Sequence, residues 1–197
     1  MNKKETALIN LSSLSSANIH ACKLAGPSGI IPKPGQVICG NIDMRIDRNG
    51  KWYHQGSPIE RIELVRLFAS VLQRDDDGCY WLITPAEMAR IEVEDAPFLA
   101  VELFRTGDGP KQSLFLRTNL DAIITVDESH PIRVIVNYDT GEPKPYVVLD
   151  GDIEAKISRA VYYELVSLCE EKHQGSDILG VWSRNFFFTL GALGTRI

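Results

Sequence analysis

Apolar and charged residues alternate along several short segments of the chain. Residues 42–47 alternate without interruption, which is the period of a strand with one buried face. Asn49-Gly50 follows and tolerates the positive φ angles of a tight turn, so a hairpin with a second strand through residues 52–54 is predicted. The same pattern and its turn residues predict strands at residues 79–84, 91–93, 98–104, 113–116, 123–126, 132–137, 146–149 and 153–157.

A helical period of apolar residues occurs in three places. Residues 5–24 are moderately amphipathic and predict one helix or two short ones. A second helix is expected to start at Ser57 as its cap, and its wide apolar face indicates burial on most sides. A third is expected to be capped by Ser158 and to end near Lys172. Helices and short strands together indicate an α+β protein.

One pattern occurs twice in the same register. A glycine turn is followed seven residues later by a serine, and six residues after that by an amphipathic helical segment that begins Glu-Leu-Val. Such self-similarity is typical of a duplicated unit. We therefore expect two related halves, each a mostly antiparallel sheet with one amphipathic helix. The copies are Asn49-Gly50, Ser57 and Glu63-Leu64-Val65, and Asp150-Gly151, Ser158 and Glu164-Leu165-Val166.

The predicted organisation has three parts. Residues 1–38 form an N-terminal helix and linker, residues 39–95 the first α+β half, and residues 96–197 the second. An interface between two related halves is a common place for a ligand to bind.

Composition and net charge limit the kinds of binding partner that we expect for this protein. The 197 residues carry a formal net charge of -5, with 44% hydrophobic residues, as expected for a soluble globular protein. A non-specific nucleic-acid binder needs an excess of basic residues, so that class is not expected. No segment approaches the roughly 20 apolar residues of a membrane helix, and the N-terminus lacks the apolar core of a signal peptide. We expect a cytoplasmic protein without membrane attachment.

Motifs for metal binding and catalysis are absent from the sequence. The four cysteines are scattered, without a C-x-x-C pair or an adjoining histidine cluster, so neither a zinc site nor a redox pair is predicted. Glycine-rich phosphate loops do not occur, and the four histidines stand apart from any nucleophile pattern. We predict no catalytic residues, no metal and no cofactor, although a hydrolase site assembled only in space stays an alternative.

Two short segments contain residues suited to holding an anion. Arg117 and Asn119 directly follow an apolar strand, and His130 and Arg133 lie at the start of another. A guanidinium group offers a fork of donors to a phosphate or carboxylate. Trp182 is a candidate for stacking on a ring, although packing in the core is expected for at least two of the three tryptophans. A surface ion pair or a hydrogen bond that braces a loop is the alternative role of the arginines.

A resemblance to a known family rests on many segments in order. They are residues 39–46, 50–53, 56–59, 64–68, 80–85 and 93–98, then Arg117-Thr118-Asn119, His130-Pro131-Ile132-Arg133 and Gly180-Val181-Trp182-Ser183. In these the chain resembles an uncharacterised bacterial family of domains of unknown function, found mainly in proteobacteria. The resemblance implies two β-rich halves with a helix in each, the C-terminal half similar to a pleckstrin-homology-like barrel.

The resemblance also implies a role, which we write as an expectation. Members are suspected of binding a nucleotide-like ligand between the halves and of acting in signal transduction. Our leading hypothesis is a binding module for a small anionic or nucleotide-like ligand, with Arg117, Asn119, His130, Arg133 and Trp182 as the binding residues. A protein-interaction adaptor is the second hypothesis, and a hydrolase is the third.

Overall fold

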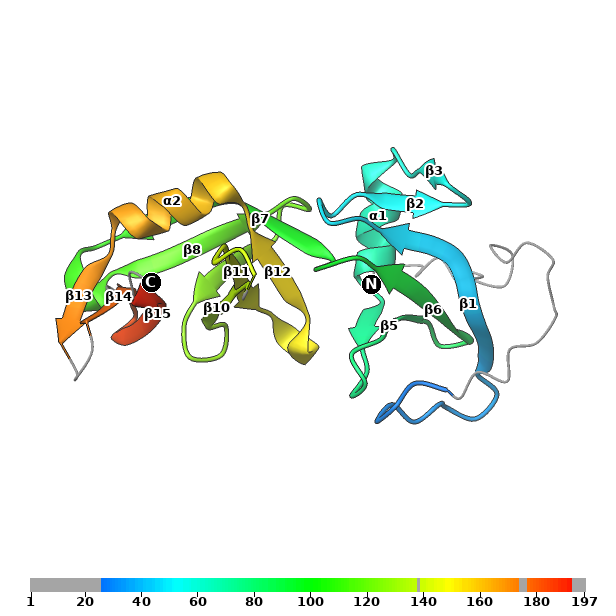
Figure 1. The fold of residues 1–197 in the computed structure, drawn as a ribbon. Coiled ribbons are helices and arrows are strands. Elements are labelled where there is room, and N and C mark those ends of the chain that lie inside the picture. The colour runs from blue at the N-terminus through cyan, green and yellow to red at the C-terminus, as the bar shows by residue number, and fades with distance from the viewer. Residues whose placement is uncertain (1–25, 138, 174–176, 193–197) are drawn as a thin grey trace, which may run out of the picture. The chain divides into compact units, whose positions relative to one another are not determined.

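The computed structural model describes residues 26–137, 139–173 and 177–192, and the chain divides after Glu94 into two compact units (Figure 1). The helix expected within residues 5–24 lies outside the described residues. The architecture is α+β with two related halves, as predicted. Among the described residues, each half contains one α-helix and a six-stranded sheet, and the C-terminal half adds a small third sheet.

The N-terminal unit is a six-stranded sheet with the order β3-β2-β1-β6-β5-β4. Its central pair, β1 and β6, is parallel, and the other pairs are antiparallel. A parallel central pair was not part of the sequence prediction. The elements are β1 (Val37–Ile46), β2 (Trp52–His54), β3 (Ser57–Pro58), α1 (Ile62–Ala69), β4 (Leu72–Arg74), β5 (Tyr80–Ile83) and β6 (Glu87–Val93).

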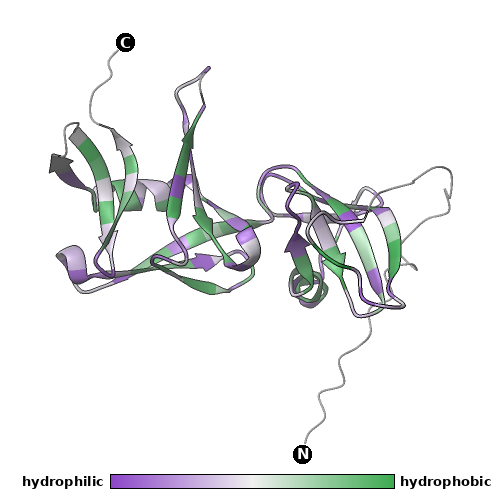
Figure 2. Cartoon of the chain, turned by 90° about the horizontal axis from the view of Figure 1, so that it is seen from below, coloured by the Kyte–Doolittle hydropathy of each residue, from purple (hydrophilic) through white to green (hydrophobic). Residues whose placement is uncertain are grey.

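The alternation of apolar and charged residues along β1 buries one face of the strand, as predicted. Ile42, Met44 and Ile46 are buried, with exposed fractions of 2% or less. Trp52 is buried as well, and its ring stacks on Phe68 of α1 with centroids 6.1 Å apart. The hydrophobic residues of the strands are visible in both units in Figure 2. The core of this unit therefore lies between the inner face of its sheet and α1.

The start of α1 differs from the prediction. Ser57 does not cap a helix; it pairs with His54 in a short β hairpin, and the helix begins only at Ile62, after Arg61. Ile62 is 38% exposed, so this helix is not buried on most sides. The local cap signal at Ser57 was outweighed by the backbone hydrogen bonds that extend β2 into β3.

The C-terminal unit contains a six-stranded sheet that curls into a half-barrel, with the order β10-β11-β12-β7-β8-β9. A three-stranded sheet, β13-β14-β15, follows α2. The elements are β7 (Phe98–Thr106), β8 (Ser113–Thr118), β9 (Ile123–Val126), β10 (Ile132–Val136), β11 (Pro143–Val148), β12 (Glu154–Ile157), α2 (Arg159–Ser167), β13 (Glu170–His173), β14 (Asp177–Ser183) and β15 (Phe186–Ala192).

The helix of this unit begins as predicted and ends earlier. Ser158 is its N-cap, and its hydroxyl accepts a hydrogen bond from the amide of Val161. The helix ends at Ser167, because the chain then enters β13 instead of continuing to Lys172. One core joins α2, the half-barrel and the third sheet. It includes Ala100, Leu114, Leu116, Val126, Val147, Ala155, Val161, Leu165, Val181, Phe188 and Leu190.

The two six-stranded sheets share one strand order. In each, the first strand lies parallel to the sixth at the centre, and the remaining strands follow outward as antiparallel neighbours. The helix, however, follows the third strand in the N-terminal unit and the sixth strand in the C-terminal unit. The repeated sequence pattern therefore leads into the helix in both units. Its turn and its serine, however, lie between different strands of the shared order in the two sheets.

Candidate functional site

A pocket of about 340 Å³ lies in the C-terminal unit between the ends of β11 and β12 and the first turns of α2. Three basic side chains and two tyrosines line it, and we call it the basic pocket. A volume near the lower end of the range for ligand pockets suits a small molecule. The lining residues are Glu142, Pro143, Lys144, Pro145, Lys156, Ile157, Arg159, Tyr162 and Tyr163.

The β11–β12 hairpin brings the basic residues together. Its turn contains Gly151 at a φ of 68°, and the register places Tyr146 opposite Lys156. Side chains two residues apart on a strand share a face, so Lys144 lies on the same face as Tyr146 and Lys156. Ser158 then starts α2 directly after β12, which places Arg159 in the first turn of the helix. The positive end of the helix dipole adds to the preference of this place for an anion.

Asp95 holds one of the pocket lysines in place. Its carboxylate accepts a hydrogen bond from Lys156 Nζ at 2.6 Å and one from the Tyr146 hydroxyl at 2.7 Å. Burial by itself raises the pKa of Asp95, but the hydrogen bonds from Lys156 and Tyr146 and the charge of Lys144 outweigh it and lower that pKa. Burial and the neighbouring carboxylate raise the pKa of Tyr146, so this hydroxyl stays a donor.

The other two basic groups of the pocket are less constrained. Arg159 Nε donates to the Tyr163 hydroxyl at 3.0 Å, and its guanidinium lies 5.5 Å from the centre of that ring. Lys144 has no ion-pair partner among the residues that the structure describes. Glu142 also lines the pocket and offsets part of the positive charge. The pocket therefore combines the ammonium group of Lys144, an exposed guanidinium group and tyrosine rings, which together can bind a small anion attached to a ring.

The segment with Arg117 and Asn119 has mainly structural contacts. Arg117 Nε donates to Glu102 at 2.6 Å and Nη1 donates to Asp121 at 2.7 Å, and these hydrogen bonds raise its pKa. Asn119 is bound to the start of β7 by two hydrogen bonds. Its backbone amide donates to the carbonyl of Leu99, and its side-chain oxygen accepts from the backbone amide of Leu99. Arg117 thus forms the surface ion pairs that were the alternative role, and Asn119 braces a loop.

His130 and Arg133 also contact carboxylates. Nδ1 of His130 lies 3.4 Å from Asp127, and Nε2 lies 3.6 Å from Asp150. Arg133 donates twice to Glu154 Oε1, at 2.9 and 2.6 Å. The hydrolase hypothesis asks for a histidine within hydrogen-bonding reach of a serine, a cysteine or a carboxylate inside a cleft. His130 has the carboxylates of Asp127 and Asp150 beside it, but it does not line the basic pocket.

Trp182 is half-buried at the surface of the third sheet. Its indole nitrogen donates to Glu170 at 3.0 Å, and its ring meets Phe187 edge to face with centroids 5.0 Å apart. The other two tryptophans, Trp52 and Trp81, are buried, as expected.

The five predicted site residues all lie in the C-terminal unit, and none of them lines the basic pocket. Arg133 comes nearest in the sheet: it is opposite Tyr146, which is itself opposite Lys156, so the three form one row across β10, β11 and β12. The other four are not brought together with that row by any described contact.

Sequence reasoning missed the pocket residues, because the register that joins them differs from the predicted one. A two-residue turn at Asp150-Gly151 would place Lys156 opposite Pro145 and Lys144 on the other face of the hairpin. The observed turn is the three-residue segment Asp150–Asp152, which pairs Lys156 with Tyr146 and so brings Lys144 to the same face. Arg159, one residue after the predicted cap, then follows at the start of the helix. Neither lysine belongs to a known motif, and only the pairing register shows that they are neighbours.

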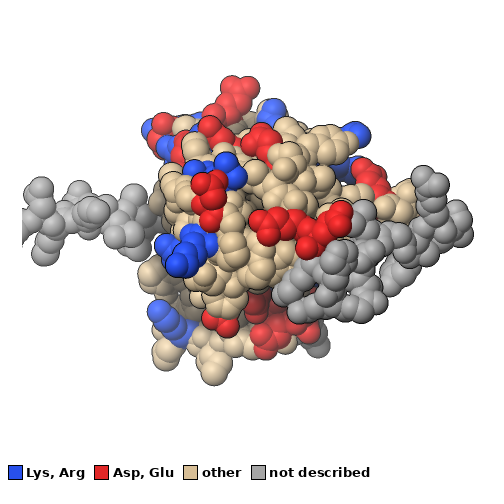
Figure 3. All heavy atoms as spheres, turned by 90° about the vertical axis from the view of Figure 1, so that its left-hand side faces the viewer, with Lys and Arg blue, Asp and Glu red and all other residues tan. Residues whose placement is uncertain are grey.

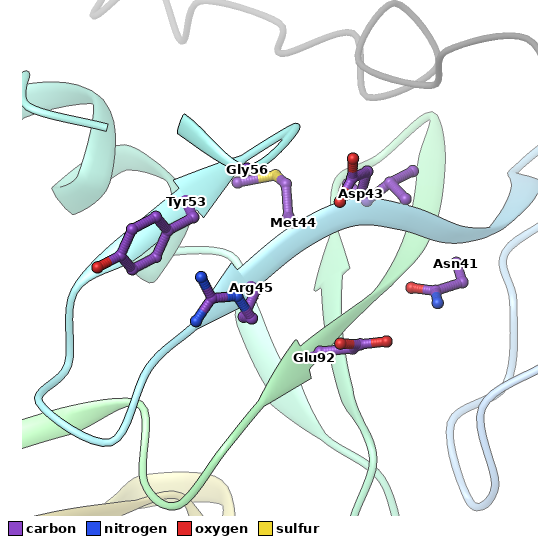
Figure 4. Close-up of a pocket in the computed structure, with 8 residues that line it drawn as sticks. Asn41, Asp43, Met44, Arg45, Tyr53, Gly56 and Glu92 are labelled. Carbon is purple, nitrogen blue, oxygen red and sulfur yellow. The ribbon is translucent and has the colours of Figure 1, made fainter. Parts of the chain in front are cut away.

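A second pocket, of about 330 Å³, lies on β1 and differs in charge (Figure 4). It opens where β1 bulges against β6, since the four-residue step from Asn41 to Arg45 matches a two-residue step on β6. Arg45 lies over the Tyr53 ring, 4.2 Å from its centre, and its Nη1 donates to Glu94 at 2.7 Å. The carboxylates of Asp43 and Glu92 line the rest of this β1 pocket, which is therefore unsuited to an anion.

Three other kinds of site can be compared with the described residues: a nucleic-acid surface, a metal site and a membrane-spanning helix. On the face shown in Figure 3, acidic and basic residues are interspersed, so that face offers no continuous basic surface to a nucleic acid. Within residues 26–137, 139–173 and 177–192, no group of three or more histidine, cysteine, aspartate or glutamate side chains could hold a metal ion. The helices in these ranges are all too short or too polar to cross a membrane.

Comparison with known proteins agrees with the duplicated α+β architecture. Two family models match the chain: the N-terminal domain of unknown function DUF1285 at residues 33–96, and the C-terminal domain of the protein of unknown function DUF1285 at residues 97–190. The chain belongs to this DUF1285 family. Among curated proteins, none matches the chain.

Two crystal structures of family members resemble the chain. A DUF1285 family protein from Silicibacter pomeroyi DSS-3 is 38% identical, with a TM-score of 0.74, over 85% of this chain and 92% of that one. A DUF1285 family protein from Shewanella baltica OS155 is 30% identical, with a TM-score of 0.51, over 64% of this chain and 91% of that one. The family predicted from the sequence, an uncharacterised bacterial one with two halves, is thereby confirmed.

Proposed function

We propose that this protein is a binding module for a small anionic ligand, nucleotide-like ligands included, and that it acts in signal transduction. The observation that carries the proposal is the basic pocket, in which Lys144, Lys156 and Arg159 surround a space lined by two tyrosines. The basic groups would hold the anion, and a tyrosine ring would lie against an attached base or other ring. Placement of the ligand where the two halves meet stays a prediction from the sequence.

Charge decides between the two pockets. The β1 pocket presents Asp43 and Glu92 beside one cation, Arg45, which is paired with Glu94. The basic pocket presents three cations against the carboxylate of Glu142, and one of the three, Lys156, is paired with Asp95. An anion near two carboxylates is repelled, and one near an ammonium and a guanidinium is attracted. Because Arg159 and Lys144 are exposed, the attraction is screened by salt, and binding should weaken as ionic strength rises.

Thermal unfolding with a small panel of ligands tests the proposal. Binding to the folded state raises the melting temperature in proportion to affinity and concentration. We expect inorganic pyrophosphate and adenosine monophosphate to raise it, and uncharged adenosine to raise it less or not at all. Failure of every anion to stabilise the protein at low salt would contradict the proposed function.

Variants locate the binding to the pocket. Lys144→Met and Arg159→Met should each reduce the stabilisation by pyrophosphate, because each removes one charge from the lining. Lys111→Met is the matched control, since Lys111 is an exposed lysine of the same unit that does not line the pocket. Equal loss in Lys111→Met and Lys144→Met would indicate a general charge effect and would count against this site.

The adaptor hypothesis has an observation of its own. β10 is an edge strand of the half-barrel, and Ile135 and Val136 on it are 41% and 53% exposed. An exposed apolar edge can add a strand from a partner. A protein captured in stoichiometric amount by the wild type and lost with Ile135→Lys would favour this role, whereas capture of no protein would count against it.

A further inference from the structure

Two consecutive carboxylates lie on either side of the boundary between the two units, and each contacts residues of its own unit. Glu94 belongs to the N-terminal unit, where it binds Arg45 at 2.7 Å and its amide donates to the carbonyl of Ile46 at 3.0 Å. Asp95 belongs to the C-terminal unit, where it binds Lys156 and Tyr146. Each side of the boundary is therefore attached to its own unit by a carboxylate.

Lys156 is attached to the junction in two ways. Its backbone lies opposite Leu99 in the parallel pair of β12 and β7, whose register runs from Phe98 to Ala100 (Figure 1). Its side chain reaches back to Asp95, four residues before Leu99. The segment of residues 95–97, which we call the junction, is thus held by the side-chain contact at one end and by the start of β7 at the other.

The same ammonium group lines the basic pocket. Side-chain exposures of 28% for Lys156 and 19% for Asp95 leave the pair partly open to solvent, so a ligand entering the pocket can reach Nζ. A phosphate group carries more charge than one carboxylate and offers three oxygens, so it competes effectively for that ammonium. The positive charge of Lys144 also attracts the carboxylate of Asp95. An anion bound to Lys144 would offset that charge and weaken this attraction as well.

We propose that an anion in the basic pocket draws Lys156 away from Asp95 and thereby loosens the attachment of the junction, residues 95–97, to the C-terminal unit. This inference rests on the proposed function, and it adds how ligand binding would be transmitted along the chain. Tyr146 stays bound to Asp95 after the release, so the carboxylate keeps one of its two side-chain donors. In the free protein the junction is held to the C-terminal unit by both Lys156 and Tyr146, and in the liganded protein it is held by Tyr146 alone.

Hydrogen exchange of the full chain, read on peptides that cover residues 94–99, tests the release. We expect inorganic pyrophosphate at saturating concentration to speed exchange of these amides by about tenfold, the ratio expected when a charge-assisted hydrogen bond is lost. A ligand that only stabilises the fold slows exchange instead, so the sign of the change is diagnostic. Lys156→Met and Asp95→Asn should each show the faster exchange without pyrophosphate.

Lys111→Met is the matched control for this experiment. Lys111 is an exposed lysine of the same unit that does not line the pocket, so exchange at residues 94–99 should match the wild type with and without pyrophosphate. Thermal stabilisation by pyrophosphate without faster exchange would overturn the release alone. Absence of any stabilisation would overturn the proposed function and the release with it, and unchanged exchange in both Lys156→Met and Asp95→Asn would overturn the role of the pair in holding the junction.

Discussion

Ser183 joins the third sheet to the half-barrel through Val126. Its hydroxyl donates to the carbonyl of Val126 at 2.6 Å and accepts from the amide of Leu114 at 3.0 Å, and its side chain is fully buried. The Gly180-Val181-Trp182-Ser183 segment, which contributed to the family resemblance, therefore contains a residue that connects strands of two sheets. Ser183 therefore has a structural role, which is to join the third sheet to the half-barrel.

Ser183→Ala should destabilise the protein by about 2 kcal/mol, because it leaves the amide of Leu114 and the carbonyl of Val126 buried without this partner. Urea unfolding of wild type and variant measures the difference. Ser167→Ala is the control: its hydroxyl donates to the carbonyl of Glu164 on the exposed side of α2, so we expect a change below about 0.5 kcal/mol. A similar change in both variants would contradict the special role of Ser183.

Gly180→Ala should destabilise the third sheet. A Cβ at Gly180 would lie 2.4 Å from the carbonyl oxygen of Phe188 and 2.7 Å from the Phe187 ring, so the backbone of β15 would have to shift. Overpacking of this kind costs about 1–3 kcal/mol. Gly191 lies in the same hairpin with open space at its Cβ, and Gly191→Ala should have little effect. Chemical unfolding of the two variants side by side checks the contrast.

The two serines of the repeated pattern should respond differently to substitution. Ser158→Ala removes the cap of α2 and should cost about 0.5–1 kcal/mol, the lower part of the usual range because the cap hydrogen bond is long, at 3.4 Å. Ser57 is exposed in β3 and caps no helix, so Ser57→Ala should change the free energy of unfolding little. Equal effects would indicate that the two copies act alike after all.

Acid should remove the stabilisation by Asp95. Because the folded-state pKa of Asp95 lies below the unfolded value of about 3.9, its contribution is complete above that pH and is lost as the pH falls through the folded pKa. The difference in unfolding free energy between wild type and Asp95→Asn should therefore be largest near neutral pH and shrink below about pH 4. Asp108→Asn, at a carboxylate that is 88% exposed, is the control, and it should change the free energy of unfolding by less than about 0.5 kcal/mol. A difference that is as large at pH 3 as at pH 7 would contradict the assignment.

Most strands were predictable because their signals are local. The alternation at residues 42–46, the glycine turns and the cap at Ser158 act within a few residues, and each appears in the structure at the expected place. The hairpin of β14 and β15 has no such local signal. At its turn Arg184 and Asn185 adopt positive φ angles of 52° and 68°, and their amides donate hydrogen bonds to the carbonyls of Gln112 and Pro110. Those partners are about 70 residues away in the chain, beyond the reach of a local pattern.

The candidate site was less predictable than the fold. Arginine beside an amide, as in Arg117 and Asn119, is a reasonable anion signal, but the same groups equally satisfy carboxylates and backbone that the fold brings near. Lys144 and Lys156 carry no motif and became neighbours through the register of one hairpin and the start of one helix. The sequence shows which residues are charged, whereas the fold decides which of these charges become neighbours.

The sequence by itself determined the α+β class, the two halves, most strands and the family, because periodicity, turn residues and recurring segments are properties of neighbours in the chain. Tertiary structure alone decided the parallel pairs β1–β6 and β7–β12, the loss of the cap at Ser57 and the attachment of Lys156 to Asp95. These depend on hydrogen bonds between residues that the fold brings together, 61 positions apart in the last case. Such contacts form only when the burial of a whole core outweighs local preference.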